Sequence, residues 1–150
     1  MDKIDRKLLL LLQEDASRTN AELADMVALS PSSCLRRVRR LKAAGMIDGV
    51  VALLNPSKVG KSLKAIITVE LARHDEQSRK RFLDLASREN AVTQAYSVTG
   101  QTDAILVMRA GDMEEVADTC SRIFDESSNV TRYYTMIVKR TGKDTTAIPL

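Results

Sequence analysis

The sequence predicts an α+β protein with two parts: a helical N-terminal part, and a C-terminal part in which strands and helices alternate. Over the first 45 residues apolar side chains recur at helical spacing, whereas from residue 64 they alternate with polar ones, as in a half-buried strand. The segment 55–62, "NPSKVGKS", separates the two patterns. With 150 residues and 44% hydrophobic content, the chain can form one ordinary domain or two small ones.

Two helices are predicted at the N-terminus. The first spans 3–14, where Ile4, Leu8 and Leu11 form an apolar stripe. The four residues "TNAE" at 19–22 form a capping box, which starts a second, short helix.

A third helix follows closely. Ser30 suits the N-cap and Pro31 the first helical position, so this helix spans about 31–44 and ends at Gly45. Because only a short turn separates the second and third helices, the pattern is that of a helix–turn–helix. The stretch "MIDGVVALLNP" after it predicts a short two-stranded wing.

The C-terminal part predicts a ferredoxin-like sheet. Its elements are, in order, a strand at 64–72, a helix near 76–89, strands at about 91–99 and 103–110, a helix opened by Asp112 and Glu115, and a strand at 130–138. The order β-α-β-β-α-β is the ferredoxin-like one. The predicted domains are therefore a winged helix–turn–helix domain at 1–54, a hinge linker at 55–62, a βαββαβ domain at 63–140 and a C-terminal tail at 141–150.

The predicted sheet has apolar side chains on both faces. Ile66 and Thr68 oppose Ile67 and Val69, and Leu106 and Met108 alternate with Ile105 and Val107 in the same way. Since the helices of this fold cover one face, we expect a partner subunit to cover the other, giving a homodimer.

The third predicted helix has an unbalanced charge. The chain has 23 basic and 20 acidic residues, yet 29–47 contains five basic residues and no acid. On a helical wheel Ser33, Arg36, Arg37 and Arg40 lie opposite the apolar side, with Arg39 on the flank. Without acidic partners these arginines would repel one another, and a polyanion removes the difficulty.

These charges favour double-stranded DNA as the partner. The alternative is a basic face that meets only solvent, but the helix–turn–helix pattern favours a recognition helix. RNA fits less well, because the few aromatic residues provide little stacking surface. The candidate DNA-binding residues are Ser30, Ser32, Ser33, Arg36, Arg37, Arg39 and Arg40.

Several motifs together carry a family resemblance that spans essentially the whole chain. They are the "IDRKLL" opening, the "LSPS" helix entry, the "CLRRVRRL" helix, the "GMI" exit, the "LNP" hinge and the βαββαβ half. In these the chain closely resembles the leucine-responsive regulator/AsnC (Lrp/AsnC, feast/famine) family of transcriptional regulators. The resemblance implies an ACT-like (RAM) sensing domain, dimers that can assemble to an octamer, and an amino-acid effector that changes assembly or DNA affinity.

The resemblance also implies an effector site around the turn "GQTD". Gly100 and Asp103 match the family's Gly-Asp-x-Asp turn, with Thr102 between them, whereas Gln101 replaces an acid and removes one cation partner. The facing positions on the last strand are Tyr134, Thr135 and Met136. The alternative from the residues alone is an ordinary hairpin turn, where Gly and Asp are common.

Other classes of function have less support. The segment "VGKS" lacks the first glycine of a phosphate-binding loop, and the lone histidine, His74, is expected to be a solvated loop residue and cannot by itself form a metal site. We therefore expect no enzyme, no cofactor and no metal. Without a membrane-length apolar run and with two separated cysteines, the chain is expected in the cytoplasm. The remaining alternatives are an amino-acid-binding module that does not bind DNA and an architectural DNA-binding protein without an amino-acid effector.

Overall fold

The computed structural model describes residues 1–125 and 129–150, and the chain forms two compact units. The first unit comprises Met1–Leu53 together with Gly142–Leu150, and the second comprises Leu54–Thr141. The C-terminal tail is therefore part of the first unit. Within that unit the side-chain amide of Gln13 exchanges two hydrogen bonds with the backbone of Ile148, at 3.0 and 2.6 Å.

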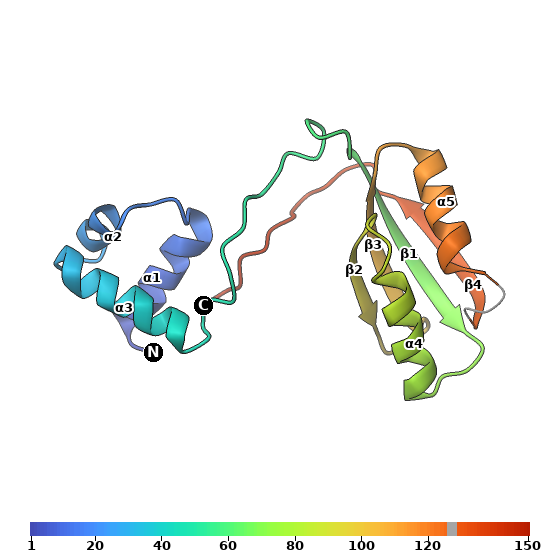
Figure 1. Ribbon diagram of the computed structural model, residues 1–150, viewed down its shortest axis with the longest axis horizontal. Coiled ribbons are helices and arrows are strands. Elements are labelled where there is room, and N and C mark those ends of the chain that lie inside the picture. Colours follow the sequence, from blue (N-terminus) through green and yellow to red (C-terminus); the bar gives the residue numbers. More distant parts are fainter. Residues whose placement is uncertain (126–128) are drawn as a thin grey trace. The chain divides into compact units, whose positions relative to one another are not determined.

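The first unit contains three helices (Figure 1): α1 (Lys3–Glu14), α2 (Asn20–Met26) and α3 (Pro31–Ala43). The predicted capping box at the start of α2 is present, with Thr19 and Glu22 exchanging hydrogen bonds. Ser30 caps α3, as predicted. A second capping box, between Asp2 and Asp5, opens α1, and sequence reasoning did not find it.

Apolar side chains from all three helices form the core of this unit. Its buried residues are Leu8, Leu9, Leu11, Leu23, Ala24, Val27, Cys34, Val38 and Leu41. The turn from α2 to α3 passes through Ala28, whose φ of 54° is in the left-handed region, and Leu29 N–H closes it on Ala24 O at 2.9 Å. This tight turn makes the predicted helix–turn–helix.

The predicted wing is wrong. Between the end of α3 and Leu63 the described residues contain no strand, and Val50, Val51 and Leu53 are exposed. The β-branched residues favour an extended chain, but within this unit the segment has no neighbouring strand to supply the hydrogen bonds of a ribbon.

The second unit has the predicted βαββαβ order. Its elements are β1 (Leu63–Leu71), α4 (Glu76–Ala86), β2 (Val92–Ser97), β3 (Ala104–Ala110), α5 (Met113–Ile123) and β4 (Val130–Ile137). The sheet is antiparallel in the order β2-β3-β1-β4. Both helices lie on the same face of the sheet (Figure 1).

Alternate residues of the central strands pack under these helices. Ile67, Leu106 and Met108 are fully buried there with Phe82 of α4 and Ile123 of α5. The opposite, open face has no covering element within this unit, and two rows of paired side chains cross it. They are Tyr96–Ile105–Thr68–Tyr134 and Gln94–Val107–Ile66–Met136. The expected apolar character of both faces is therefore confirmed.

Candidate functional site

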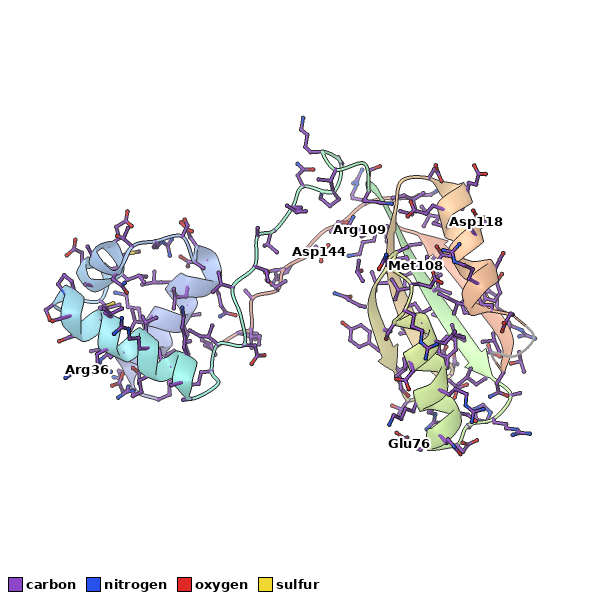
Figure 2. The ribbon with its side chains drawn as sticks, viewed as in Figure 1. Arg36, Glu76, Met108, Arg109, Asp118 and Asp144 are labelled. Atoms are coloured by element: carbon purple, nitrogen blue, oxygen red, sulfur yellow. The ribbon has the colours of Figure 1, made fainter. Side chains whose placement is uncertain are left out.

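The first candidate site is the exposed face of α3. Cys34, Val38 and Leu41 face the core, as the wheel predicted. Arg36 and Arg39 are exposed, and no ion pair or hydrogen bond holds either side chain within residues 1–125 and 129–150. Figure 2 shows the side chain of Arg36 extending from α3 away from α1 and α2. These two guanidiniums are available to bind an anion.

The other two arginines are already paired, so the expectation that the arginines lack acidic partners is wrong for them. Arg37 Nη1 donates to Asp2 Oδ2 at 2.6 Å and to Asp5 Oδ1 at 2.9 Å. Arg40 Nη2 donates to the two carboxylate oxygens of Asp5 at 2.9 and 2.8 Å. The acids come from the start of α1, more than 30 residues earlier, so inspection of the neighbouring sequence could not find them.

The carboxylates of Asp2 and Asp5 are held in the charged form. Burial alone would raise the pKa of Asp5, but the Asp2 N–H and the guanidiniums of Arg37 and Arg40 hold it below its ordinary value. The hydrogen bond from Arg37 likewise lowers the pKa of Asp2. The pKa of Arg37 rises in turn, because both carboxylates favour its charged form.

The start of α3 carries three hydroxyl groups at the positions predicted to approach DNA. Ser30 Oγ accepts from Ser33 N–H at 3.3 Å and donates to Ser33 Oγ at 2.9 Å, so both take part in the cap. Ser32 Oγ lies 3.2 Å from Ser30 Oγ at the exposed helix start. The structure thus brings these serines together with Arg36 on one helix.

The second candidate site is the turn between β2 and β3. Gly100 has a φ of +123°, a conformation that side chains rarely adopt. Val98 N–H donates to Asp103 O at 3.0 Å and closes the hairpin. Thr102 Oγ1 ties the turn to the neighbouring strand by donating to Val69 O at 2.7 Å. Gly100 and Gln101 are exposed at the tip.

Asp103 does not extend freely into this site. Its Oδ2 accepts from Leu71 N–H at 2.9 Å, its Oδ1 lies 2.9 Å from His74 Nδ1, and Arg79 Nη2 lies 3.7 Å away. Burial would raise the pKa of Asp103, but the Leu71 N–H and the basic side chains hold it below its ordinary value. The resemblance assigns Asp103 to the effector site, but these contacts already engage both of its carboxylate oxygens.

His74 and Arg79 are the residues that sequence reasoning missed here. His74 was expected to be a solvated loop residue, and its side chain is indeed 65% exposed, yet its ring contacts Asp103. The acidic residue beside it in sequence, Asp75, instead caps α4. Only knowledge of the β1–β3 pairing would have placed His74 beside Asp103.

The three predicted positions on β4 do not join the turn within one chain. Strand β1 lies between β3 and β4, so it separates them from Gly100. Tyr134 and Met136 pair with Thr68 and Ile66 on the open face, whereas Thr135 pairs with Ile67 on the helix-covered face.

Residues 1–125 and 129–150 contain no group of three or more His, Cys, Asp or Glu residues that could hold a metal ion. No helix in them has both the length and the apolar character needed to cross a membrane.

Both parts of the chain match family models. The AsnC-type helix-turn-helix domain matches residues 1–42, and the Lrp/AsnC ligand binding domain matches residues 64–148. The first match covers the three helices of the first unit except the last residue of α3, and the second covers the sheet and its two helices except the first residue of β1.

Individual proteins show the same similarity over nearly full length. The Leucine-responsive regulatory protein of Rhizobium meliloti is 37% identical over 144 residues, which cover 96% of this chain and 92% of that protein. An AsnC family transcriptional regulator from Agrobacterium tumefaciens has a TM-score of 0.93 at 30% identity, covering 99% of this chain and 97% of that chain. A transcriptional regulator from Neisseria meningitidis, solved in complex with L-Met, has a TM-score of 0.89 at 34% identity, covering 99% and 96%.

Proposed function

Since the chain belongs to the Lrp/AsnC family of transcriptional regulators, we propose that it binds duplex DNA through α3 and that a small effector at its second unit controls this binding. The observation that carries the proposal is the pair of exposed arginines, Arg36 and Arg39, on the second helix of a helix–turn–helix. Neither has an anionic partner within the described residues. Arginine binds phosphate oxygens and the guanine edge in the major groove through the same planar fork.

The proposed DNA-binding face begins at the N-terminus of α3. In a helix–turn–helix the second helix enters the major groove with its first turns nearest the base edges. Ser32 and Arg36 lie there, and Arg39 follows one turn further along. The predicted residues Ser30, Ser32, Ser33, Arg36, Arg37, Arg39 and Arg40 all lie on this helix or at its N-cap, but Arg37 and Arg40 are held by acids of α1.

Two copies of the chain form the DNA-binding species in this proposal. The open sheet face supports a homodimer, because Ile66, Ile105 and Val107 lie side by side on it without a covering element in the second unit. A twofold dimer presents two α3 helices to successive major grooves of a pseudo-palindromic site. Dimers can then assemble further, to an octamer.

The proposed effector is an amino acid bound at the turn around Gly100. A neighbour in structure was solved with L-Met, which supports this class of ligand. Because the oxygens of Asp103 are engaged, the exposed backbone at Gly100 and the amide of Gln101 are the groups here that can reach a ligand. An amide recognises a carboxylate or an ammonium group without adding charge.

The DNA-binding proposal is tested by selection. The purified protein is mixed with fragmented genomic DNA of its source, and retained fragments are sequenced. We expect a small set of fragments that share an inverted repeat. Uniform recovery of all fragments would favour an architectural DNA-binding protein, and recovery of none would favour an amino-acid-binding module that does not bind DNA.

The effector proposal needs a separate experiment. A thermal-shift screen of the twenty amino acids is combined with light-scattering mass in the presence of each. We expect at least one amino acid to raise the unfolding temperature and change the mass, because a ligand stabilises the state that it binds. Absence of any shift would exclude an amino-acid effector.

The proposal makes this chain a binding protein rather than an enzyme, with no cofactor. It also places the chain in the cytoplasm, where a bacterial-type regulator meets the chromosome.

A further inference from the structure

The start of α1 holds part of the basic face of α3 through two carboxylates, of which Asp5 alone contacts both Arg37 and Arg40. Asp5 is only 3% exposed, and its two oxygens accept from Arg37, from Arg40 and from the backbone N–H of Asp2. A buried carboxylate with this many charge-assisted donors is fixed in position. The side chains of Arg37 and Arg40 are fixed with it.

We propose that Asp5 is a positioning residue that divides the arginines of α3 into two pairs with different tasks. Arg37 and Arg40 share Asp5, and with Asp2 on Arg37 the two acids balance the two positive charges and fix the helix on α1. Arg36 and Arg39 remain charged and unpaired, and they supply the phosphate-binding charge. This inference rests on the proposed function and names the residues of that same surface.

The contacts that each arginine would have to break to reach a phosphate support this division into two pairs. Arg37 is 25% exposed and bonded to two carboxylates, so to reach a phosphate it must leave both. Arg40 is 61% exposed, but its Nη2 is shared between the two oxygens of Asp5, and its departure would leave a buried charge with fewer partners. Arg36 and Arg39 break no such contact when they bind DNA.

The division also bears on specificity. Each cation that meets a phosphate releases counterions, which strengthens binding to every sequence alike. By pairing with two of the four arginines, Asp5 together with Asp2 limits this sequence-independent binding. It also holds the helix in one orientation, on which contacts to base edges depend.

The salt dependence of DNA binding tests the proposal, because it counts phosphate contacts. The full-length protein is titrated with a mixed-sequence duplex of about 40 base pairs, roughly four helical turns, at several salt concentrations. Arg36→Ala and Arg37→Ala form a matched pair, since neighbouring residues undergo the same change. Arg39→Ala and Arg40→Ala repeat the comparison, and far-UV circular dichroism checks that each variant is folded.

We expect Arg36→Ala and Arg39→Ala to reduce the salt slope by about 0.9 for each bound helix, the value of one phosphate contact. Arg37→Ala and Arg40→Ala should change it by less than half as much. Asp5→Asn should steepen the slope, because Arg40 loses its carboxylate partner while Arg37 keeps only Asp2. If Asp5→Asn does not fold, Asp2→Asn replaces it, since Asp2 is half exposed and contacts only Arg37 of these arginines.

Equal slope changes for Arg36→Ala and Arg37→Ala would overturn the inference, as would an unchanged slope in the folded acid-to-amide variant. The proposed function fails in a different way, namely if the wild-type protein binds no duplex even at low salt. The two failures are therefore distinguishable.

Discussion

His74 Nδ1 lies 2.9 Å from Oδ1 of Asp103, which joins the loop after β1 to the turn between β2 and β3. The other oxygen of Asp103 accepts from the backbone N–H of Leu71, a buried residue. Asp103 therefore fixes the position of the turn that carries Gly100. A family resemblance places this acid in an effector site, and the structure gives it a structural task as well.

Replacement of Asp103 should destabilise the second unit. Asp103→Ala leaves the buried Leu71 N–H without its acceptor, and we expect a loss of about 1–3 kcal/mol in the free energy of unfolding. His74→Ala should cost less, under about 1 kcal/mol, because the histidine is largely exposed. All three tyrosines lie at positions 96, 133 and 134, so tyrosine fluorescence during urea unfolding follows this unit alone. Equal losses in the two variants would contradict this assignment.

Acid should destabilise the first unit through Asp5. The folded state lowers the pKa of Asp5 below that of the unfolded chain, so its contribution to stability is complete above the unfolded value of about 3.9. That contribution is lost as the pH falls through the lower, folded-state pKa. Hydrogen exchange of the α1 amides at decreasing pH measures the effect, and Asp5→Asn should flatten it. The same acid response in both proteins would show that Asp5 does not contribute.

The backbone conformation of Gly100 predicts that a side chain at this position would lower the stability of the second unit. A side chain at φ +123° is strained although the space around it is open, so Gly100→Ala should lower stability by about 1–3 kcal/mol. Gly49→Ala is the control, since its added methyl group also meets nothing within 4 Å and its φ lies outside the left-handed region. Urea unfolding monitored by circular dichroism gives both values. A harmless Gly100→Ala change would mean that the turn readily adopts another conformation.

A charge on the open sheet face should separate the proposed dimer. Ile105→Glu places a carboxylate in the middle of the row between Tyr96 and Thr68, where a partner subunit would have to bury it. Light scattering should then report a monomer mass. Gln77→Glu adds the same charge at an exposed position of α4 and should leave the mass unchanged. A dimer that survives Ile105→Glu would have to form through another surface.

Local patterns explain why most of the fold could be predicted. The helix starts at Ser30 and Thr19 depend on side chains within three residues, and the strands follow from alternation along the chain. The prediction of a wing was wrong because a two-stranded ribbon needs a second strand beside the first. The β-strand propensity of Val50 and Val51 cannot provide that second strand. The family resemblance, based on ordered motifs, was confirmed by matches to both units.

Contacts between distant segments explain what could not be predicted at the candidate sites. Helical periodicity placed Arg37 on the basic face, but its partners Asp2 and Asp5 belong to another helix. The same holds for Asp103, whose partners His74 and Arg79 come from the segment after β1. In both cases a charge that looked free in the sequence is paired in the fold.

The central claim is that the exposed face of α3 binds DNA, and a fluorescence anisotropy titration tests it most directly. The duplex is one recovered by the selection described above, and the proteins compared are the wild type and Arg36→Ala. We predict that Arg36→Ala weakens binding by about 1–3 kcal/mol, roughly 5- to 150-fold, with unchanged circular dichroism. Equal affinity of the two folded proteins for that duplex would contradict the claim.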